Sequence, residues 1–201
     1  MTTTIQPEAS RVSAPALMTA EELLTYPEAD KRVELVRGRL IVREPPGMRH
    51  GECELRIAVA LSNFLTADRA ARSATQTLGR VMVGDPGFTL ARNPDTVRAP
   101  DIAYVSRERL DGPIPHGFGE FAPDLAVEIW SPTDRPGAVL AKVGAWLTAG
   151  LQLVWVVDPM HQVVTVYRAD GSQALLGVHD ALPGEDLLPG FSLSLEELFA
   201  E

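Results

Sequence analysis

The feature that most restricts the fold of this chain is a run of six residues, 125–130, in which five apolar side chains accompany one acid, Glu128. In a β-strand, successive side chains point to opposite faces, so both faces of this strand are apolar. Such a strand lies at the centre of a sheet. A carboxylate buried there costs several kcal/mol unless it is paired, hydrogen-bonded or bound to a metal. We therefore expect Glu128 to have a partner.

Residues 135–149 follow with a helical pattern that carries Lys142. Its apolar stripe consists of Val139, Val143, Trp146 and Leu147. Lys142 falls on the flank of this stripe, so we expect the lysine to lean inward. The chain has two lysines against sixteen arginines. A lysine at such a position indicates a role for a compact ammonium group.

The order of the segments predicts an α/β fold. After Gly150 ends the helix, the apolar run 151–157 completes a strand-helix-strand unit, which implies a parallel pair of strands. Further strands are expected at 75–78, 80–83, 87–90, 97–105 and 163–167, a hairpin at 32–43 with its turn at Arg37-Gly38, and helices after Thr19, from Met48 and after Ser194. We expect a mixed central sheet flanked by helices, with an additional N-terminal hairpin. Residues 17–201 are predicted to form one domain and residues 1–16 a loosely attached tail.

Composition limits the setting in which the protein works. A single cysteine, Cys53, excludes an internal disulfide and fits a reducing cytosol. The sequence has neither a membrane span of about 18 apolar residues nor a signal peptide, so we expect a cytoplasmic protein. The net charge of −9 argues against nonspecific coating of nucleic acid. This net charge still allows a local basic groove. A carboxylate cluster that holds a divalent cation would itself contribute negative charge.

Three further residues are candidates for a site. Asp101 follows Pro100 near the start of a predicted strand, Glu34 lies in the hairpin, and His50 lies in the first turn of a helix. Taken alone, each residue also fits a role outside any site: Asp101 as a turn acid, Glu34 as a solvent-facing acid and His50 as a surface or capping residue. Two acids on neighbouring strands with a lysine nearby, however, suit a hard divalent ion and phosphodiester hydrolysis.

A known family shows the same residues in the same order. The similar segments are residues 34–38, His50, Pro100-Asp101, 127–132, Lys142 with Trp146, Gly150 and 154–159. They resemble the Uma-two type of restriction endonucleases, a bacterial branch of the PD-(D/E)XK nuclease superfamily. The resemblance covers roughly residues 18–167. It implies a restriction-endonuclease-like fold for the α/β domain and a nuclease that uses Mg²⁺ or Mn²⁺ and acts on DNA.

The resemblance also implies roles for individual residues. Asp101 and Glu128 match the two metal-binding acids, and the carbonyl of Ile129 would be a further ligand. The lysine of the E-x-K motif would fall at position 130, where this chain has Trp130. Lys142 matches a position to which that lysine has migrated, on the next helix.

Two more positions of the chain match the family. Glu34 matches an early acid that many superfamily members place near the metal, and His50 matches a position that the family often fills with histidine. Glu34 is thus implied as a catalytic residue and His50 as a secondary candidate.

Other functions are open from the sequence. Trp130 and the acidic charge also suit a catalytically inactive nuclease fold that serves as a binding or assembly module, in which Glu128 and Lys142 form a purely structural ion pair. A two-carboxylate hydrolase of another substrate, such as a glycoside, explains neither the lysine nor the motif order. A homodimer is a further expectation, with Trp155 or the hairpin near Val163 supplying an apolar patch; neither a membrane nor a disulfide-linked partner is expected.

Overall fold

The computed structural model describes residues 17–27, 32–71, 78–110, 112–132 and 134–201. The predicted tail 1–16 and most of the predicted strand 75–78 lie outside these residues. The elements in chain order are α1 (Ala20–Leu24), β1 (Arg32–Val36), β2 (Arg39–Arg43), α2 (Met48–Ala71), β3 (Gly79–Val83), β4 (Phe88–Ala91), β5 (Thr96–Arg98), β6 (Ile102–Ser106), β7 (Leu125–Ile129), α3 (Pro136–Thr148), β8 (Leu153–Asp158), β9 (Val163–Arg168), β10 (Gln173–Leu176), β11 (Ala181–Pro183), β12 (Ser192–Ser194) and α4 (Leu195–Phe199).

The strands of the described residues form a mixed six-stranded sheet and two smaller sheets. The order in the large sheet is β10-β9-β8-β7-β6-β3, and that in the four-stranded sheet is β2-β1-β5-β4. β7 and β8 pair in parallel, as the strand-helix-strand unit predicts, and their neighbours in the large sheet are antiparallel. The predicted α/β fold with a mixed central sheet and an N-terminal hairpin is confirmed.

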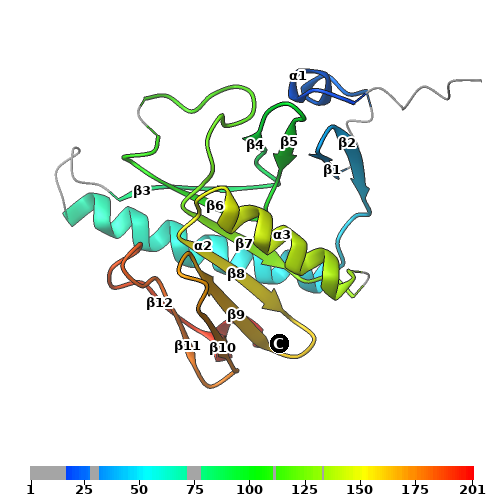
Figure 1. Cartoon of the computed structure of the whole chain (residues 1–201). Coiled ribbons are helices and arrows are strands. Elements are labelled where there is room, and N and C mark those ends of the chain that lie inside the picture. The colour runs from blue at the N-terminus through cyan, green and yellow to red at the C-terminus, as the bar shows by residue number, and fades with distance from the viewer. Residues whose placement is uncertain (1–16, 28–31, 72–77, 111, 133) are drawn as a thin grey trace, which may run out of the picture.

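Two helices cover the opposite faces of the large sheet, with α2 behind it and α3 in front (Figure 1). All five residues of β7 are buried. Leu125, Val127 and Ile129 belong to the hydrophobic cluster that α2 covers, whereas Ala126 belongs to the cluster that α3 covers. The alternation in the sequence therefore corresponds to two cores, one on each face of the sheet.

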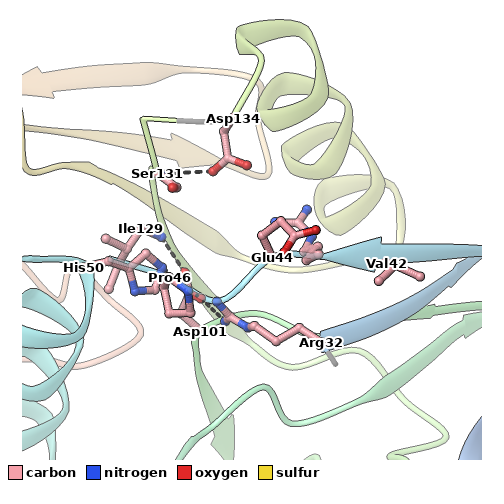
Figure 2. Close-up of a pocket in the computed structure, with 10 residues that line it drawn as sticks. Arg32, Val42, Glu44, Pro46, His50, Asp101, Ile129, Ser131 and Asp134 are labelled. Atoms are coloured by element: carbon pink, nitrogen blue, oxygen red, sulfur yellow. Dashed lines mark hydrogen bonds and ion pairs between the residues drawn. The ribbon is translucent and has the colours of Figure 1, made fainter. Parts of the chain in front are cut away.

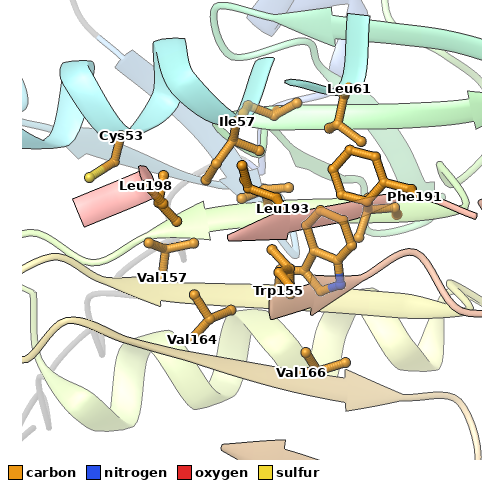
Figure 3. Packing of buried hydrophobic residues seen from close by; sticks show 14 of the residues in the cluster. Cys53, Ile57, Leu61, Trp155, Val157, Val164, Val166, Phe191, Leu193 and Leu198 are labelled. Atoms are coloured by element: carbon orange, nitrogen blue, oxygen red, sulfur yellow. The ribbon is translucent and has the colours of Figure 1, made fainter. Parts of the chain in front are cut away.

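The core beneath α2 is centred on Trp155 of β8 (Figure 3). The indole stacks on Phe191 with 5.8 Å between the ring centroids and is completely buried. The prediction that Trp155 supplies an exposed patch for dimerisation is therefore wrong. β8 lies between β7 and β9 with both faces covered, and for that reason its apolar side chains are core residues.

The strand predicted over residues 97–105 is divided into two. β5 pairs with β1 in the four-stranded sheet, and β6 pairs with β3 and β7 in the large sheet. The break includes Pro100, which has no N–H for a strand ladder. Asp101 comes directly before β6, so it lies where the chain passes from one sheet to the other.

Helix ends follow the sequence signals. Thr19 caps α1 with a capping box to Glu22, and the Ser194 side chain accepts a hydrogen bond from the backbone N–H of Glu197 at the start of α4. In the part of the chain that is described, none of the helices has the length and apolar character needed to cross a bilayer.

We expect Trp155→Ala to lower the free energy of unfolding by about 3–5 kcal/mol, because it leaves a large cavity under α2. Trp155→Phe is the matched control: it keeps a ring against Phe191 and removes an indole N–H that has no hydrogen-bond partner among the described residues. Trp155→Phe should lower the free energy of unfolding by less than Trp155→Ala does. Urea unfolding followed by circular dichroism measures both, and equal midpoints for wild type and Trp155→Ala would contradict the prediction.

Candidate active site

Lys142 lies at the centre of a buried group of charges. Its ammonium donates to Glu128 Oε2 at 2.7 Å and to the carbonyl oxygen of Ala99 at 2.8 Å, and it lies 2.9 Å from Glu34 Oε1. An ammonium has three protons, and here each has an acceptor. The expected inward lean of the lysine is confirmed, because the apolar stripe of α3 packs on the large sheet and carries Lys142 with it.

Glu128 has a donor for each carboxylate oxygen. Oε2 accepts from Lys142, and Oε1 accepts from the indole N–H of Trp146 at 2.7 Å. Burial raises the pKa of Glu128, the negative charges of Asp101 and Glu34 raise it further, and Lys142 opposes them. The expectation that this buried acid has a partner is confirmed.

Glu34 enters the same group from the four-stranded sheet. Its carboxylate accepts from Arg98 at 2.7 Å and from the backbone N–H of Ala99 at 3.2 Å. The side chain is 2% exposed, so the reading of Glu34 as a solvent-facing acid is wrong. Burial disfavours the charged form, but Lys142, Arg43 and Arg98 outweigh it and lower the pKa of Glu34 to about 2.

Asp101 links β7 of the large sheet to β1 of the four-stranded sheet. Its Oδ2 accepts from the backbone N–H of Ile129 at 2.6 Å, and its Oδ1 forms an ion pair of 2.5 Å with Arg32, which is also paired with Asp85. Burial opposes ionisation, yet His50, the ammonium of Lys142 and the N–H of Ile129 lower the pKa of Asp101 to about 2. Asp101 is therefore a buried, ionised carboxylate.

His50 is also part of this arrangement. It is 6% exposed, which contradicts its reading as a surface residue, and its Nε2 lies 3.3 Å from Asp101 Oδ1. Its Nδ1 is buried and has no hydrogen-bond partner among the described residues; the nearest acid oxygen, from Glu54, lies 4.0 Å away. Residues 44–47 connect β2 to α2, and the first turn of α2 holds the imidazole against Asp101.

Two cavities meet at these side chains. The larger, of about 240 Å³, is lined by Arg32, Val42, Arg43, Glu44, Pro46, His50, Asp101, Ile129, Ser131 and Asp134. In Figure 2, Arg32 reaches from β1 towards Asp101, with Ile129 and His50 beside it. The smaller, of about 20 Å³, has room for about one water molecule. It is lined by Arg43, Glu128, Ile129, Trp130, Asp134, Ala138, Val139, Lys142 and Val156.

The two acids thus open into separate but adjoining spaces. Asp101 lines the larger cavity, Glu128 and Lys142 line the smaller, and three residues line both: Arg43, Ile129 and Asp134. Asp101 also accepts from the N–H of Ile129, the residue next to Glu128 in the chain. The structure therefore brings Asp101, Glu128, Lys142, Glu34 and His50 to one place, on the two sides of Ile129.

The donor set can be tested against a divalent metal. Within the described residues, no three His, Cys, Asp or Glu side chains are grouped so as to hold an ion. Mg²⁺ does not need such a group, because it takes one or two carboxylates and completes its shell with water and substrate phosphate. Asp101 and Glu128 fit that requirement. The guanidinium of Arg32 lies against Asp101 as a stand-in cation, so a metal there would replace an existing ion pair.

The sequence patterns did not identify Arg32, Arg43, Arg98 or Asp134 as site residues. Sixteen arginines give no signal by type. A usable signal existed in the hairpin: a two-residue turn at Arg37-Gly38 fixes the register, which places Arg32 directly opposite Arg43. What the two arginines face depends on the packing of the hairpin on the large sheet, which the turn does not determine.

Comparison with known proteins identifies the family and the fold of the chain. The chain belongs to the Uma2 family, described as "Putative restriction endonuclease", whose model matches residues 20–196. The structure is similar to that of "a putative nuclease belonging to DUF820" from Anabaena variabilis ATCC 29413, with a TM-score of 0.75 and 23% identity over 90% of this chain and 97% of that one. At this identity the likeness shows the fold. No curated protein matches the chain. The resemblance read from the motif order is confirmed at the level of the family.

We expect the charge group around Glu34 to make stability depend on acid pH. The pKa of Glu34 is 4.5 ordinarily and about 2 in the folded chain, so the unfolded chain takes up this proton first. The stabilisation is fully present above pH 4.5 and is lost as the pH falls towards 2, by roughly 1.4 kcal/mol per unit. Urea unfolding at pH 5 and pH 3 should therefore show that the free energy of unfolding changes less between the two pH values for Glu34→Gln than for wild type.

The control for this measurement is Glu196→Gln, which removes an exposed glutamate of α4 outside the site. It should follow the wild-type pH dependence. If Glu34→Gln loses as much stability as wild type between the two pH values, the ion pairs of Glu34 do not have the assigned strength.

Proposed function

We propose that this protein is a divalent-metal-dependent phosphodiester hydrolase that cuts DNA, with Asp101 and Glu128 as its metal-binding acids. The observation that carries the proposal is the link through Ile129: its N–H fixes the Asp101 carboxylate, and its chain neighbour Glu128 lines the adjoining cavity. Membership in a family described as a restriction endonuclease supports the same reaction class. The expected homodimer, with one site for each strand of a duplex, remains part of this proposal.

In the proposed site, Asp101, Glu128 and the carbonyl of Ile129 would hold Mg²⁺ or Mn²⁺. The ion would supply polarisation of the phosphate and a lower pKa for a bound water. The residues of the chain prepare the site for it. The N–H of Ile129 and the imidazole of His50 orient Asp101, and Trp146 orients Glu128 through its indole N–H.

Lys142 would assist the attacking water in this proposal. In the ligand-free chain its three protons are already directed at Glu128, Glu34 and Ala99. Donation to water therefore requires that one of these acceptors be given up. A cation on Glu128 would weaken the carboxylate's hold on the lysine, because both positive charges compete for the same oxygens. Glu34 would keep the ammonium charged and in place.

One observation favours the second candidate, an inactive nuclease fold that binds a partner. Glu128, Lys142 and Trp146 satisfy one another, and the cavity beside them has a volume of only about 20 Å³. A purely structural ion pair would have this geometry. Metal binding separates the two candidates, because a nuclease site should take up the ion, whereas a purely structural ion pair should not.

We expect wild-type protein to cut duplex DNA in the presence of Mn²⁺ and Asp101→Asn to cut at least about a hundredfold more slowly, since it loses a charge at the proposed metal. Asp170→Asn is the control, because it removes a carboxylate from the exposed turn between β9 and β10. It should cut at the wild-type rate. Equal cleavage by wild type and Asp101→Asn would remove the assignment, whereas chelation with EDTA should stop all cleavage.

Isothermal calorimetry with Mn²⁺ and no DNA provides an independent test. We expect binding by wild type, none by Asp101→Asn, and tighter binding by Arg32→Gln, because the competing guanidinium is gone. The gain should be about tenfold, equivalent to one charge-assisted hydrogen bond of roughly 1.5 kcal/mol. Arg39→Gln, from the same hairpin but exposed at its far end, should match wild type. Absence of Mn²⁺ binding by both wild type and Arg32→Gln would favour the inactive module.

A further inference from the structure

Arg43 occupies the boundary between the two cavities. It is the last residue of β2, an outer strand of the four-stranded sheet, and it lines both the space beside Asp101 and the space beside Glu128 and Lys142. Arg43 therefore borders the spaces beside both acids of the proposed metal site.

The charges around the site leave this arginine weakly paired. Arg32 is neutralised by Asp85 and Asp101, and Arg98 donates to Glu34 at 2.7 Å. Arg43 approaches the same Glu34 oxygen only to 3.7 Å, with its Nε. Among the described residues its buried Nε has no hydrogen-bond partner. A buried donor without an acceptor is unfavourable, and a bound acceptor would remove that cost.

The register of the hairpin adds a second argument. Arg43 and Arg32 are direct partners across β1 and β2, so two like charges share one face of the sheet. Such a pair is unfavourable unless negative charge lies near both members. Among the residues that the structure describes, Arg32 has two acids in close ion pairs, whereas Arg43 has only the longer approach to Glu34. The position is therefore prepared for an additional anion.

We propose that Arg43 binds the phosphodiester group of the nucleic-acid strand that enters the site. The inference rests on the proposed function, because a phosphodiester cut there must lie beside both Asp101 and Glu128, at the boundary that Arg43 lines. A guanidinium presents two parallel N–H donors that match two phosphate oxygens. Arg43 would thus hold the strand by direct contact, while Arg32 stays paired with Asp85.

The test measures binding apart from cleavage. Fluorescence anisotropy with a labelled DNA duplex in EDTA gives the dissociation constant for wild type and Arg43→Gln over a range of salt concentrations. We expect about tenfold weaker binding by Arg43→Gln and a salt dependence shallower by about 0.9, the contribution of one phosphate contact. Arg39→Gln has the same change in charge on the same face of β2 and should match wild type.

Arg43→Lys guards against loss of the fold in Arg43→Gln. It keeps the charge beside Glu34 but loses the planar fork, and we expect it to bind more weakly than wild type and more tightly than Arg43→Gln. Equal binding and salt dependence for wild type and both Arg43 variants would overturn the role of Arg43 while leaving the nuclease proposal standing. Failure of wild type to bind and cut DNA would overturn the proposed function itself.

Discussion

The ammonium of Lys142 is the interaction on which the site depends. It joins three parts of the fold, since its acceptors come from β1 in the four-stranded sheet, from β7 in the large sheet and from the segment between β5 and β6. Removal of one partner from a buried ion pair costs about 3–5 kcal/mol, because the remaining charge stays buried. The lysine therefore fixes how the four-stranded sheet packs against the large sheet. This packing in turn sets the position of Asp101.

The acids around that lysine do not have equivalent environments. Asp101 and Glu34 each lie near several cations or backbone donors, and their pKa values are lowered to about 2. Glu128 is buried between the other two acids, and its pKa is raised. Neighbouring carboxylates with opposite pKa shifts are characteristic of functional sites, because one holds charge while another can exchange it. A structural ion pair between Glu128 and Lys142 would not require Asp101 and Glu34 beside it.

The arginines extend the site beyond the residues that the family motifs contain. Arg32 and Arg43 come from the hairpin, and Arg98 comes from β5, so all three belong to the four-stranded sheet, whereas Glu128 belongs to the large sheet and Asp101 borders it. The site is thus an interface between two sheets: one supplies most of its positive charge, and the other supplies the two acids proposed to bind metal. Both cavities are accordingly lined by cationic and acidic side chains together.

The sequence by itself determined most of the elements and their order. Alternation in residues 125–130 identified β7 as a buried central strand, the stripe of α3 turned Lys142 inward, and the motif order indicated the family. Tertiary structure alone decided that Glu34 and His50 are buried, that Trp155 is core, and that Arg32 covers Asp101. The physical reason is the distance along the chain over which each effect acts. Period and turn geometry act over a few neighbouring residues, whereas the environment of a charge depends on which distant strands pack around it.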